Sequence, residues 1–562
     1  MVGLAVALLF AVLSAPGTAH AQETAPSTFY VTRFDDPPPD GCLPDDCSLR
    51  EAVIAANAVP NVKRILLPLP GTYTLTRVGG GEDAAQTGDL DVTEGLAIRG
   101  LGPAGTVIDA GGLDRIFDVS NAEHALTLEL SRLSLSNGHA IASATDGGDG
   151  GAIRALASLE LIDIAIRGSV ADGSGGGVFA QGEWLGMVGG VVENNEAVVA
   201  GGGIYSASER THLSGGTFRL NTADEGGAFW TSATEFVVRG SAIDGNSARR
   251  GGGGFFGDNV IARAEAVRLA NNVALEDGGA AFGGGALDVH ETTIEGNEAG
   301  RDGGGIYAEG SLNVTNSTLS GNSAGRGGAV ISFGAVEMEN TTVSGNSAGI
   351  VGGVFVDRGA ASLRYVTIAE NTSETGSGAN LGNDGGAVTI ANSIVAGAGA
   401  DNCGGEIESL GYNLDSGASC GFAAAGDVTN ADPMLAPLAD NGGRTWTHAL
   451  LDGSAALDIA GDCNLRDQRG LWRPQDGDSD DTAACDAGAF ERQDPRCLPR
   501  GDANHDGRTN AIDAFLILQY EAELIEDISC SADVNIDGIV YVSDATIVLQ
   551  ISAGLFSPPF PN

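Results

Sequence analysis

Residues 295–307 read "EGNEAGRDGGGIY", and residues 320–330 read "SGNSAGRGGAV". The same order of marker asparagine, polar turn, glycine pair and short apolar segment recurs along the middle of the chain. The spacings between successive marker asparagines are 26, 25, 26, 25, 25, 24 and 25 residues. A fixed period of this length is typical of a solenoid. The markers are Asn195, Asn221, Asn246, Asn272, Asn297, Asn322, Asn346 and Asn371.

Each unit combines a short alternating strand, such as "SLNVTNSTLS" at 311–320, with a turn and a second short strand, and none has helical spacing. Such units predict a parallel β-helix whose rungs stack at roughly 4.8 Å. We expect the marker asparagines to form a ladder of bonded side-chain amides. We also expect each marker to adopt the left-handed backbone at its corner, with the glycine pair serving the next corner.

The repeat resembles the right-handed, pectate-lyase-like β-helix of many secreted bacterial surface proteins. A weaker form extends upstream, with Asn137 and Ser169 in the marker slot. The resemblance implies an all-β, right-handed solenoid with a cap at each end, and we place its rungs at residues 96–395.

Composition narrows the class of protein. The 562 residues include 87 glycines and only 5% aromatics, which disfavours a compact α/β enzyme. A net charge of −45 excludes nucleic acid as a partner, because a polyphosphate would be repelled. Residues 4–15 are apolar and precede "AHA" at 19–21, which predicts a signal peptide at 1–21 and a secreted protein. No other segment is apolar for long enough to span a bilayer.

Export makes the eight cysteines readable as disulfides. No CxxC pair occurs, which argues against a zinc site. Proximity in sequence predicts the pairs Cys42–Cys47, Cys403–Cys420, Cys463–Cys485 and Cys497–Cys530.

The N-terminal region, residues 22–95, offers a cover for one end of the solenoid. "CSLREAVIAANA" from Cys47 places Ser48 three residues before Glu51, which is a capping box at the start of a short helix. Leu49, Val53 and Ile54 line one face of that helix. The segment resembles the CSLREA segment that precedes secreted β-helices, which implies location and architecture rather than an activity.

Residues 396–495 are expected to close the other end. "DNGGRTWTHALL" at 440–451, "DQRG" at 467–470 and "GAFE" at 488–491 resemble the choice-of-anchor Q region, which is followed by a surface-attachment module. Taken in isolation, "DQRG" and "THALL" are compatible with parts of a catalytic site. We interpret them instead as parts of a loop-rich cap held by Arg–Asp bonds and by Cys463–Cys485.

Two twelve-residue loops near the C-terminus alternate acidic or amide residues around a glycine, which is how a chain wraps a calcium ion. Tyr541 departs from this pattern, so a water or a backbone oxygen must serve at its position. The first loop contributes Asp502, Asn504, Asp506, the carbonyl of Arg508, Asn510 and Asp513, with Gly507 at the turn. The second contributes Asp533, Asn535, Asp537, the carbonyl of Ile539, Tyr541 and Asp544, with Gly538 at the turn.

An apolar helix is predicted after each loop, at 511–524 and 542–555, and a Leu-Gln pair recurs at 518–519 and 549–550. These halves resemble dockerin type I, which we place at residues 496–562. The resemblance implies two calcium ions and a cohesin-type partner. It also implies partner-binding residues in the two positions before each final aspartate: Ala511, Ile512, Val542 and Ser543. The alternative is a calcium-stabilised tail without a partner.

No catalytic constellation is apparent, so the catalytic residues stay unknown. The histidines do not occupy equivalent positions of the repeat. The charged residues after each marker asparagine fall in turns, where we expect positive and negative side chains to form a solvated ridge. We therefore favour a secreted surface or scaffold-associated protein that binds a glycan or another surface. A polysaccharide lyase or O-glycosyl hydrolase of polysaccharide catabolism is the first alternative, and an adhesin without a glycan role is the second. The ridge comprises Asp224-Glu225, Arg249-Arg250, Glu276-Asp277, Arg301-Asp302 and Arg326.

Overall fold

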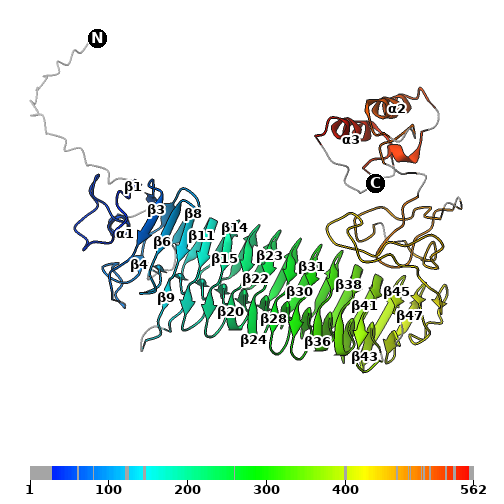
Figure 1. Ribbon diagram of the computed structural model, residues 1–562, viewed down its shortest axis with the longest axis horizontal. Helices are drawn as coiled ribbons and strands as arrows, with labels where there is room; N and C mark the ends of the chain where they lie inside the picture. Colours follow the sequence, from blue (N-terminus) through cyan, green and yellow to red (C-terminus); the bar gives the residue numbers. More distant parts are fainter. Residues whose placement is uncertain are drawn as a thin grey trace, which may run out of the picture.

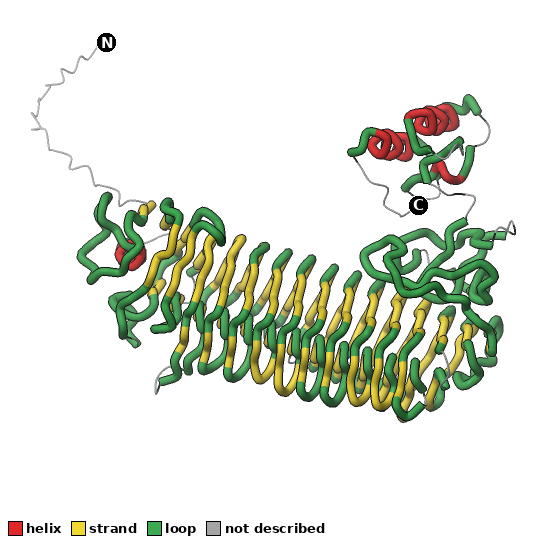
Figure 2. The backbone as a smooth tube through the Cα atoms, in the orientation of Figure 1, coloured by secondary structure: helices red, strands yellow, loops and turns green. Residues whose placement is uncertain are grey.

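The computed structural model describes residues 28–59, 63–79, 81–120, 126–143, 147–257, 260–376, 378–397, 401–463, 466–478, 480, 482–494, 497, 500–504, 508–525, 528–535 and 539–555. It is an all-β parallel solenoid with a small two-helix region near the C-terminus (Figures 1 and 2). Within these ranges, no helix has the length and apolarity needed to cross a membrane. The predicted signal peptide lies outside them.

Three parallel sheets form the sides of the solenoid, and one rung illustrates the path. β22 (Glu235–Arg239) and β23 (Ala242–Asp244) belong to a 26-stranded sheet, here the long sheet. β24 (Ser247–Gly251) belongs to a 10-stranded corner sheet, and β25 (Phe255–Gly257) to a 13-stranded back sheet. The next rung begins at β26 (Ile261–Glu265), which pairs in parallel with β22.

The stacked rungs extend beyond the predicted limits of the repeat. In the long sheet, pairing runs from β1 (Thr28–Tyr30) to β49 (Val428–Thr429). The back sheet runs from β4 (Leu90–Val92) to β46 (Cys403–Gly404). Upstream rungs lack the asparagine signal, so periodicity alone underestimates the length of the solenoid.

A ladder of buried asparagines stands at the corner between the long sheet and the corner sheet. Asn297 is 1% exposed, and its Nδ2 donates to Asn322 Oδ1 at 2.9 Å and to the Leu269 carbonyl at 3.1 Å. Its backbone N–H donates to the same Asn322 oxygen at 3.0 Å, while its own Oδ1 accepts both equivalent bonds from Asn272. The same side-chain bond links all eight markers, which confirms the predicted ladder.

The ladder continues after the period breaks. Asn371 Nδ2 donates to Asn380 Oδ1 at 2.9 Å, although Asn380 lies on the back-sheet side of the rung. Asn380 in turn donates to Asn402 at 2.9 Å. Counting on from the Thr367–Ile394 pair, the marker position after β45 (Ile394–Ala396) is residue 398, which is an alanine in the sequence. Two asparagines from the opposite side therefore replace the missing markers.

The left-handed backbone at this corner belongs to the residue before each marker, which corrects the prediction. Leu220, Asn271 and Glu370, for example, have φ values of 55°, 53° and 59°. Ser169 does occupy a marker slot, because its backbone N–H donates to Asn195 Oδ1 at 3.0 Å. In the rung before it the slot holds Gly138, not Asn137, since the Gly138 N–H donates to Ser169 Oγ.

The glycine pair serves the following corner, as predicted. Gly201 has a φ of 66°, and a Cβ on Gly202 would lie 2.4 Å from the carbonyl oxygen of Gly227 in the next rung. The first glycine is required by conformation, and the second by the close approach of the neighbouring backbone.

The N-terminal cap is built around α1 (Leu49–Asn57), which begins at the predicted Ser48–Glu51 capping box. Arg50 on this helix is fully buried, and its Nε donates to Asp36 at 2.7 Å. Its other guanidinium nitrogens donate to the carbonyls of Ala85, Gly88 and Asp89. Arg50 therefore ties the helix to the loop that precedes the first back-sheet strand.

Buried carboxylates lie beside this loop. Burial, aided by the charges of Asp114 and Asp91, raises the pKa of Asp89 to about 8. Burial also raises the pKa of Asp91 to about 7, although the Ala85 N–H donates to its carboxylate at 2.7 Å. Both groups therefore hold protons in the folded protein at pH values where the unfolded chain has lost them.

The four predicted disulfides are confirmed. Cys403–Cys420 holds the loop at 416–427 across the last rung, where Cys420 and Phe422 join the main apolar core. The other disulfides are Cys42–Cys47, Cys463–Cys485 and Cys497–Cys530.

The ridge of mixed charge is also confirmed, with Arg326 Nη2 at 2.7 Å from Asp302 and Arg250 Nε at 2.6 Å from Asp224.

Asn297→Ala should lower the free energy of unfolding by about 3 kcal/mol, because it leaves the buried polar groups of Asn272, Asn322 and Leu269 without partners. Thermal unfolding followed by circular dichroism measures the change. Asn313→Ala, on the outer face of the neighbouring β34 (Leu312–Thr315), is the matched control and should change stability little. Equal losses for the two variants would contradict a special role for the ladder.

Stability should fall as the pH rises from 5 to 8. The folded-state pKa values of Asp89 and Asp91 exceed the unfolded value of about 3.9, so the native state binds more protons in this window and loses that advantage as the pH rises. We expect a loss of at least about 1 kcal/mol. Urea unfolding at a series of pH values tests this, and Asp89→Asn should flatten the dependence. A steeper slope in Asp89→Asn would contradict the assignment.

Candidate functional site

The C-terminal segment at 432–494, here the flanking segment, lies along the outer face of the long sheet over its last rungs (Figure 1). Ser344 Oγ and His448 Nε2 are 2.8 Å apart, and Asn340 Nδ2 donates to the Arg466 carbonyl at 3.0 Å. The "DQRG" residues stabilise this segment as predicted, with Arg469 Nη2 at 2.7 Å from Asp467. Of the residues 396–495 that are expected to close the solenoid, the loop at 416–427 lies across the last rung, whereas the flanking segment packs on the outer face of the long sheet.

A column of threonines on the long sheet positions the flanking segment. Thr293, Thr318, Thr342 and Thr367 occupy equivalent positions on four successive rungs. Thr318 Oγ1 donates to the Trp446 carbonyl at 2.5 Å, and Thr342 Oγ1 donates to Gln468 Oε1 at 2.6 Å. Thr367 Oγ1 accepts from the Ala489 N–H at 3.0 Å. The hydroxyls thus act as a row of hydrogen-bonding groups, and Thr293 is the next one beyond the covered rungs.

A groove of about 660 Å³ begins where the flanking segment ends. It crosses five consecutive rungs, from β19 (Thr217–Arg219) to β35 (Thr318–Ser320). Hydroxyl groups, glycines and charged side chains form its walls, and Arg444 and Trp446 of the flanking segment stand at one end. The residues that line it are Gly215, Gly216, Thr217, Gly240, Ser241, Ala242, Ala266, Val267, Arg268, Glu291, Thr293, Glu295, Thr318, Ser320, Arg444 and Trp446.

The charges that line the groove are paired with one another. Arg268 Nη2 lies 2.6 Å from Glu295, and its Nη1 lies 3.8 Å from Asp244. Arg444 Nε lies 2.8 Å from Glu291. Each carboxylate of the lining therefore faces an arginine, and neither is placed as a free acid or base.

Trp446 is 51% exposed, whereas the other tryptophans, Trp184, Trp230 and Trp472, are partly buried. Its backbone carbonyl accepts hydrogen bonds from Thr318 and from Gln468 Nε2, the latter at 3.0 Å. Firm anchoring of the backbone together with an exposed indole is typical of a binding surface rather than of core packing.

Aromatic residues on the back sheet form a second conspicuous feature. The Phe179–Tyr205 and Tyr205–Trp230 rings stack at centroid distances of 4.9 and 4.5 Å, with interplanar angles of 3° and 2°. The stack continues through Phe256, Phe282 and Tyr307. A sugar packs on the face of a ring, and here the faces cover one another. The stack therefore stabilises the solenoid and is not a sugar-binding platform.

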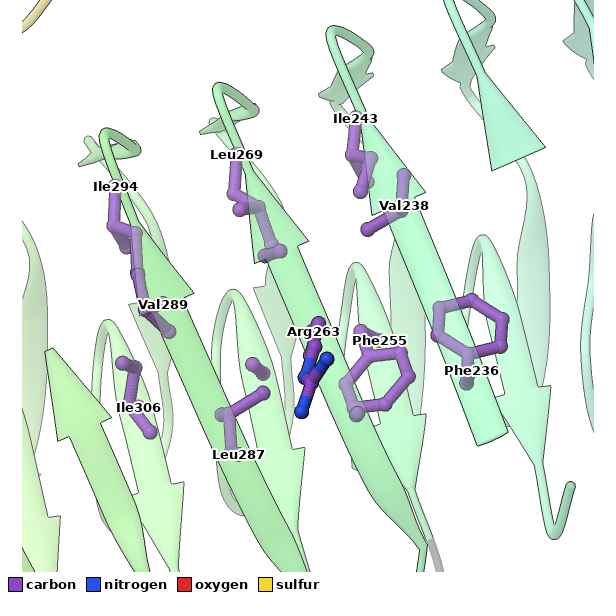
Figure 3. Close-up of a pocket in the computed structure, with 13 residues that line it drawn as sticks. Phe236, Val238, Ile243, Phe255, Arg263, Leu269, Leu287, Val289, Ile294 and Ile306 are labelled. Carbon is purple, nitrogen blue, oxygen red and sulfur yellow. The ribbon is translucent and has the colours of Figure 1, made fainter. Parts of the chain in front are cut away.

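A small void inside the solenoid is not a ligand site either. Phe236, Phe255, Leu287 and Ile306 project into it from neighbouring strands, as Figure 3 shows. Its volume is about 20 Å³, room for about one water, and its lining exposes no polar atom. It arises where small residues such as Ala264 and Ala281 replace the larger residues of adjacent rungs.

The histidines of the long sheet do not converge. His212 Nε2 lies 3.7 Å from Glu235 and its ring contacts Trp184, whereas His290 Nδ1 lies 2.8 Å from Thr315. The strand register places His212 in line with Val237, Arg263 and Asp288, two residues along the strand from His290. The sequence had indicated that these residues share no slot, and the structure agrees.

In the tail, two helices follow the predicted calcium loops. α2 (Ala511–Glu521) and α3 (Val542–Ser552) each begin where predicted, and each ends three residues before the end of the predicted segment. Asp513, in the last position of its loop, is fully buried and accepts from the backbone N–H groups of Asn504 and Asn510 at 3.2 and 2.9 Å. Asp544 is equally buried and accepts from Val534 at 2.8 Å and Tyr541 at 3.1 Å.

The carboxylate and amide oxygens of the two loops are of the chemical type that binds a calcium ion. Asp502 is 1% exposed and Asp533 is 8% exposed, so four carboxylates of the two loops are buried. Carboxylates are costly to bury without compensating charge, and alternating Asp and Asn oxygens are typical calcium ligands. Residues 505–507 and 536–538 of the loops lie outside the described residues, and they include the predicted ligands Asp506 and Asp537 and the turn glycines Gly507 and Gly538.

An acidic group that the sequence reasoning missed lies in the flanking segment. Asp476, Asp478 and Asp480 bring their carboxylates within 4.8 Å of one another and could hold a metal ion. Burial and these three charges raise the pKa of the neighbouring Asp458 to about 6. The run "DGDSDD" was the available sequence signal. Acidic groups at a surface are common without an ion, so we assign no function to this one.

Sequence reasoning also missed the threonine column and Trp446. A threonine stands four residues before the marker asparagine in five of the eight units, and this was a readable signal. Trp446 had no such signal, because its position depends on how the flanking segment docks. The five threonines are Thr217, Thr293, Thr318, Thr342 and Thr367.

No family model matches the chain, and no curated protein matches it. Among solved structures, the chain is similar to the Azotobacter vinelandii mannuronan C-5 epimerase AlgE6 A-module, with 15% identity, 68% of this chain and 99% of that chain covered, and a TM-score of 0.33. It is also similar to pectate lyase Pel9A, with 14% identity, 83% and 96% covered, and a TM-score of 0.25. At these scores neither likeness supports an argument about activity, and the assignment of a parallel β-helix rests on the strand pairing itself.

Chelation of calcium should unfold the tail and leave the solenoid intact, because the buried loop carboxylates repel one another without a cation. Hydrogen exchange of the full chain, with and without chelator, measures this for α2 and α3 separately from the long sheet. Asp502→Ala should reproduce the effect, whereas Glu521→Gln, an exposed carboxylate at the end of α2, should not. Unchanged protection of both helices after chelation would end the calcium assignment.

Proposed function

We propose that the protein is a secreted, glycan-binding β-helix protein that holds its ligand in the groove of the long sheet without turning it over. The groove itself carries this proposal. It is elongated across the rungs, it combines hydroxyl groups with one exposed indole, and its charges are already paired. Hydrogen-bonding groups beside an aromatic face are what recognition of a polyhydroxylated chain requires.

The pairing of the lining carboxylates favours binding over catalysis. A glycoside hydrolase requires two carboxyl groups that flank the scissile bond, one of them able to donate a proton. Glu291 and Glu295 each form an ion pair with an arginine, at 2.8 and 2.6 Å, so both carboxylates are already engaged within the protein. A lyase requires a cation available as a base, and Arg268 faces two carboxylates. An enzyme of polysaccharide catabolism is therefore the second candidate.

The tail is proposed as the attachment device, a dockerin-type module that binds calcium and a cohesin-type partner. Ile512, immediately before Asp513, is 57% exposed, and Val542, two residues before Asp544, is 54% exposed; Phe515 is 59% exposed one turn after Ile512. Exposed apolar side chains in a module this small support a partner surface. Ala511 and Ser543 complete the two pairs that the resemblance implies, and these pairs differ, so we expect one half to dominate the contact.

Secretion is proposed from two observations. Four disulfides link all eight cysteines, and disulfides persist in oxidising compartments. The apolar stretch at 4–15 adds the sequence signal for export.

A panel of soluble neutral and acidic polysaccharides should include ligands that retard the full chain in affinity gels, with no release of reducing or unsaturated chain ends. Thr293→Trp should abolish retardation by filling the groove. Thr222→Trp, at an exposed position of the corner sheet on β20 (Thr222–Glu225), is the control and should bind normally.

Unsaturated ends would instead identify a lyase, and new reducing ends a hydrolase. Lack of binding to every polysaccharide would contradict the glycan proposal and favour an adhesin.

A further inference from the structure

We propose that the ligand of the groove is a neutral glycan rather than a polyuronate, and that its chain runs along the solenoid axis with one sugar against Trp446. This rests on the proposed function and adds the chemical class and the direction of the chain. Three independent features of the groove carry it: the balance of its charges, the spacing of its rungs and the position of its indole.

The first feature is the charge balance. The lining contains two arginines, Arg268 and Arg444, and two glutamates, Glu291 and Glu295. Asp244 adds a further negative charge beside Arg268. A polyuronate carries one carboxylate per sugar and would need cations free to receive them, yet both arginines already contact carboxylates at 2.6 to 2.8 Å.

The charges around the groove leave it close to neutral, because the one positive charge in excess at Glu193, which two arginines share, offsets the additional negative charge of Asp244. Arg219 Nη2 lies 2.6 Å from Glu193, which also pairs with Arg167 at 2.6 Å. Arg239 Nε lies 2.8 Å from Glu265. The whole chain carries a net charge of −45, so the protein repels an anionic polymer that approaches it. A neutral glycan meets no such cost.

The second feature is the spacing of the rungs. Neighbouring parallel strands lie roughly 4.8 Å apart, which is close to the length of one sugar in an extended β-linked chain. The groove crosses five rungs, so a chain along the axis places about one sugar over each rung. The hydroxyls of Thr217, Thr293 and Ser320 belong to this lining and offer both donors and acceptors to a sugar.

The third feature is Trp446 at the end of the groove. Figure 1 places the flanking segment beside the last rungs of the long sheet, and the two hydrogen bonds to the Trp446 carbonyl fix its backbone there. Its indole is 51% exposed and lines the groove. An aromatic face binds the apolar face of a sugar ring and requires no charge on the ligand.

Calorimetry on the full chain tests the class of ligand, with soluble β-glucan, xylan and galactomannan as neutral probes and polygalacturonate and alginate as acidic ones. We expect at least one neutral glycan to bind at least tenfold more tightly than either polyuronate. We also expect its affinity to stay within about twofold between low and physiological salt, because no exposed charge pair forms. Equal or tighter binding of a polyuronate would overturn this inference while leaving the proposed function intact, whereas binding of neither class would overturn both.

Two sets of variants test the placement of the ligand. Trp446→Ala should weaken neutral glycan binding at least tenfold, Trp446→Phe should restore most of it, and Tyr30→Ala, an aromatic residue 55% exposed on β1, is the control. The double variant Asp244→Asn, Glu295→Gln should gain polyuronate binding by releasing Arg268. Matching thermal melting curves establish that the variants are folded. Unchanged binding in Trp446→Ala, or no gain in the double variant, would contradict the placement.

Discussion

The fold depends on one hydrogen-bonded corner repeated from rung to rung. Each marker asparagine satisfies its own amide and the backbone of the adjacent rung, and it does so out of contact with water, where an unpaired amide is costly. Because each oxygen accepts from the preceding asparagine, the position of one rung fixes the next. The alternating core can remain variable in size, and a void of about 20 Å³ is tolerated, since the corner sets the register.

The groove exists because the flanking segment covers only part of the long sheet. The threonine column that binds this segment on the last rungs extends one rung upstream to Thr293, and Arg268, Ala242 and Thr217 occupy the aligned positions of the rungs before it. One surface therefore serves two purposes, as a docking strip for the protein itself and as a wall of the candidate binding site. The pairing of arginines and carboxylates beside it makes that wall polar without making it strongly charged.

Much of the solenoid could be predicted from the sequence, because local period and side-chain chemistry determine it. The asparagine ladder, the glycine corner, the capping box at Ser48 and the four disulfides follow from such local patterns. The left-handed residue was misplaced by one position, since its identity varies among glycine, asparagine, leucine and glutamate and only the bonded geometry shows which residue adopts that conformation. Asn380 escaped detection because it stands nine residues after Asn371 and joins the ladder from the opposite side. The path of the flanking segment, and with it Trp446, depends on tertiary docking that no periodic signal reports.

The uniform corner also bears on how such a chain can change length. A rung that begins and ends at a marker asparagine presents the same bonding groups on both sides, so duplication of one 25-residue unit would insert between two existing rungs without a mismatch. Insertions upstream of Thr293 would lengthen the open wall by about one sugar each, while the flanking segment keeps the other end fixed. The reach of the binding surface is thus adjustable by recombination within the gene, independently of the chemistry of its walls.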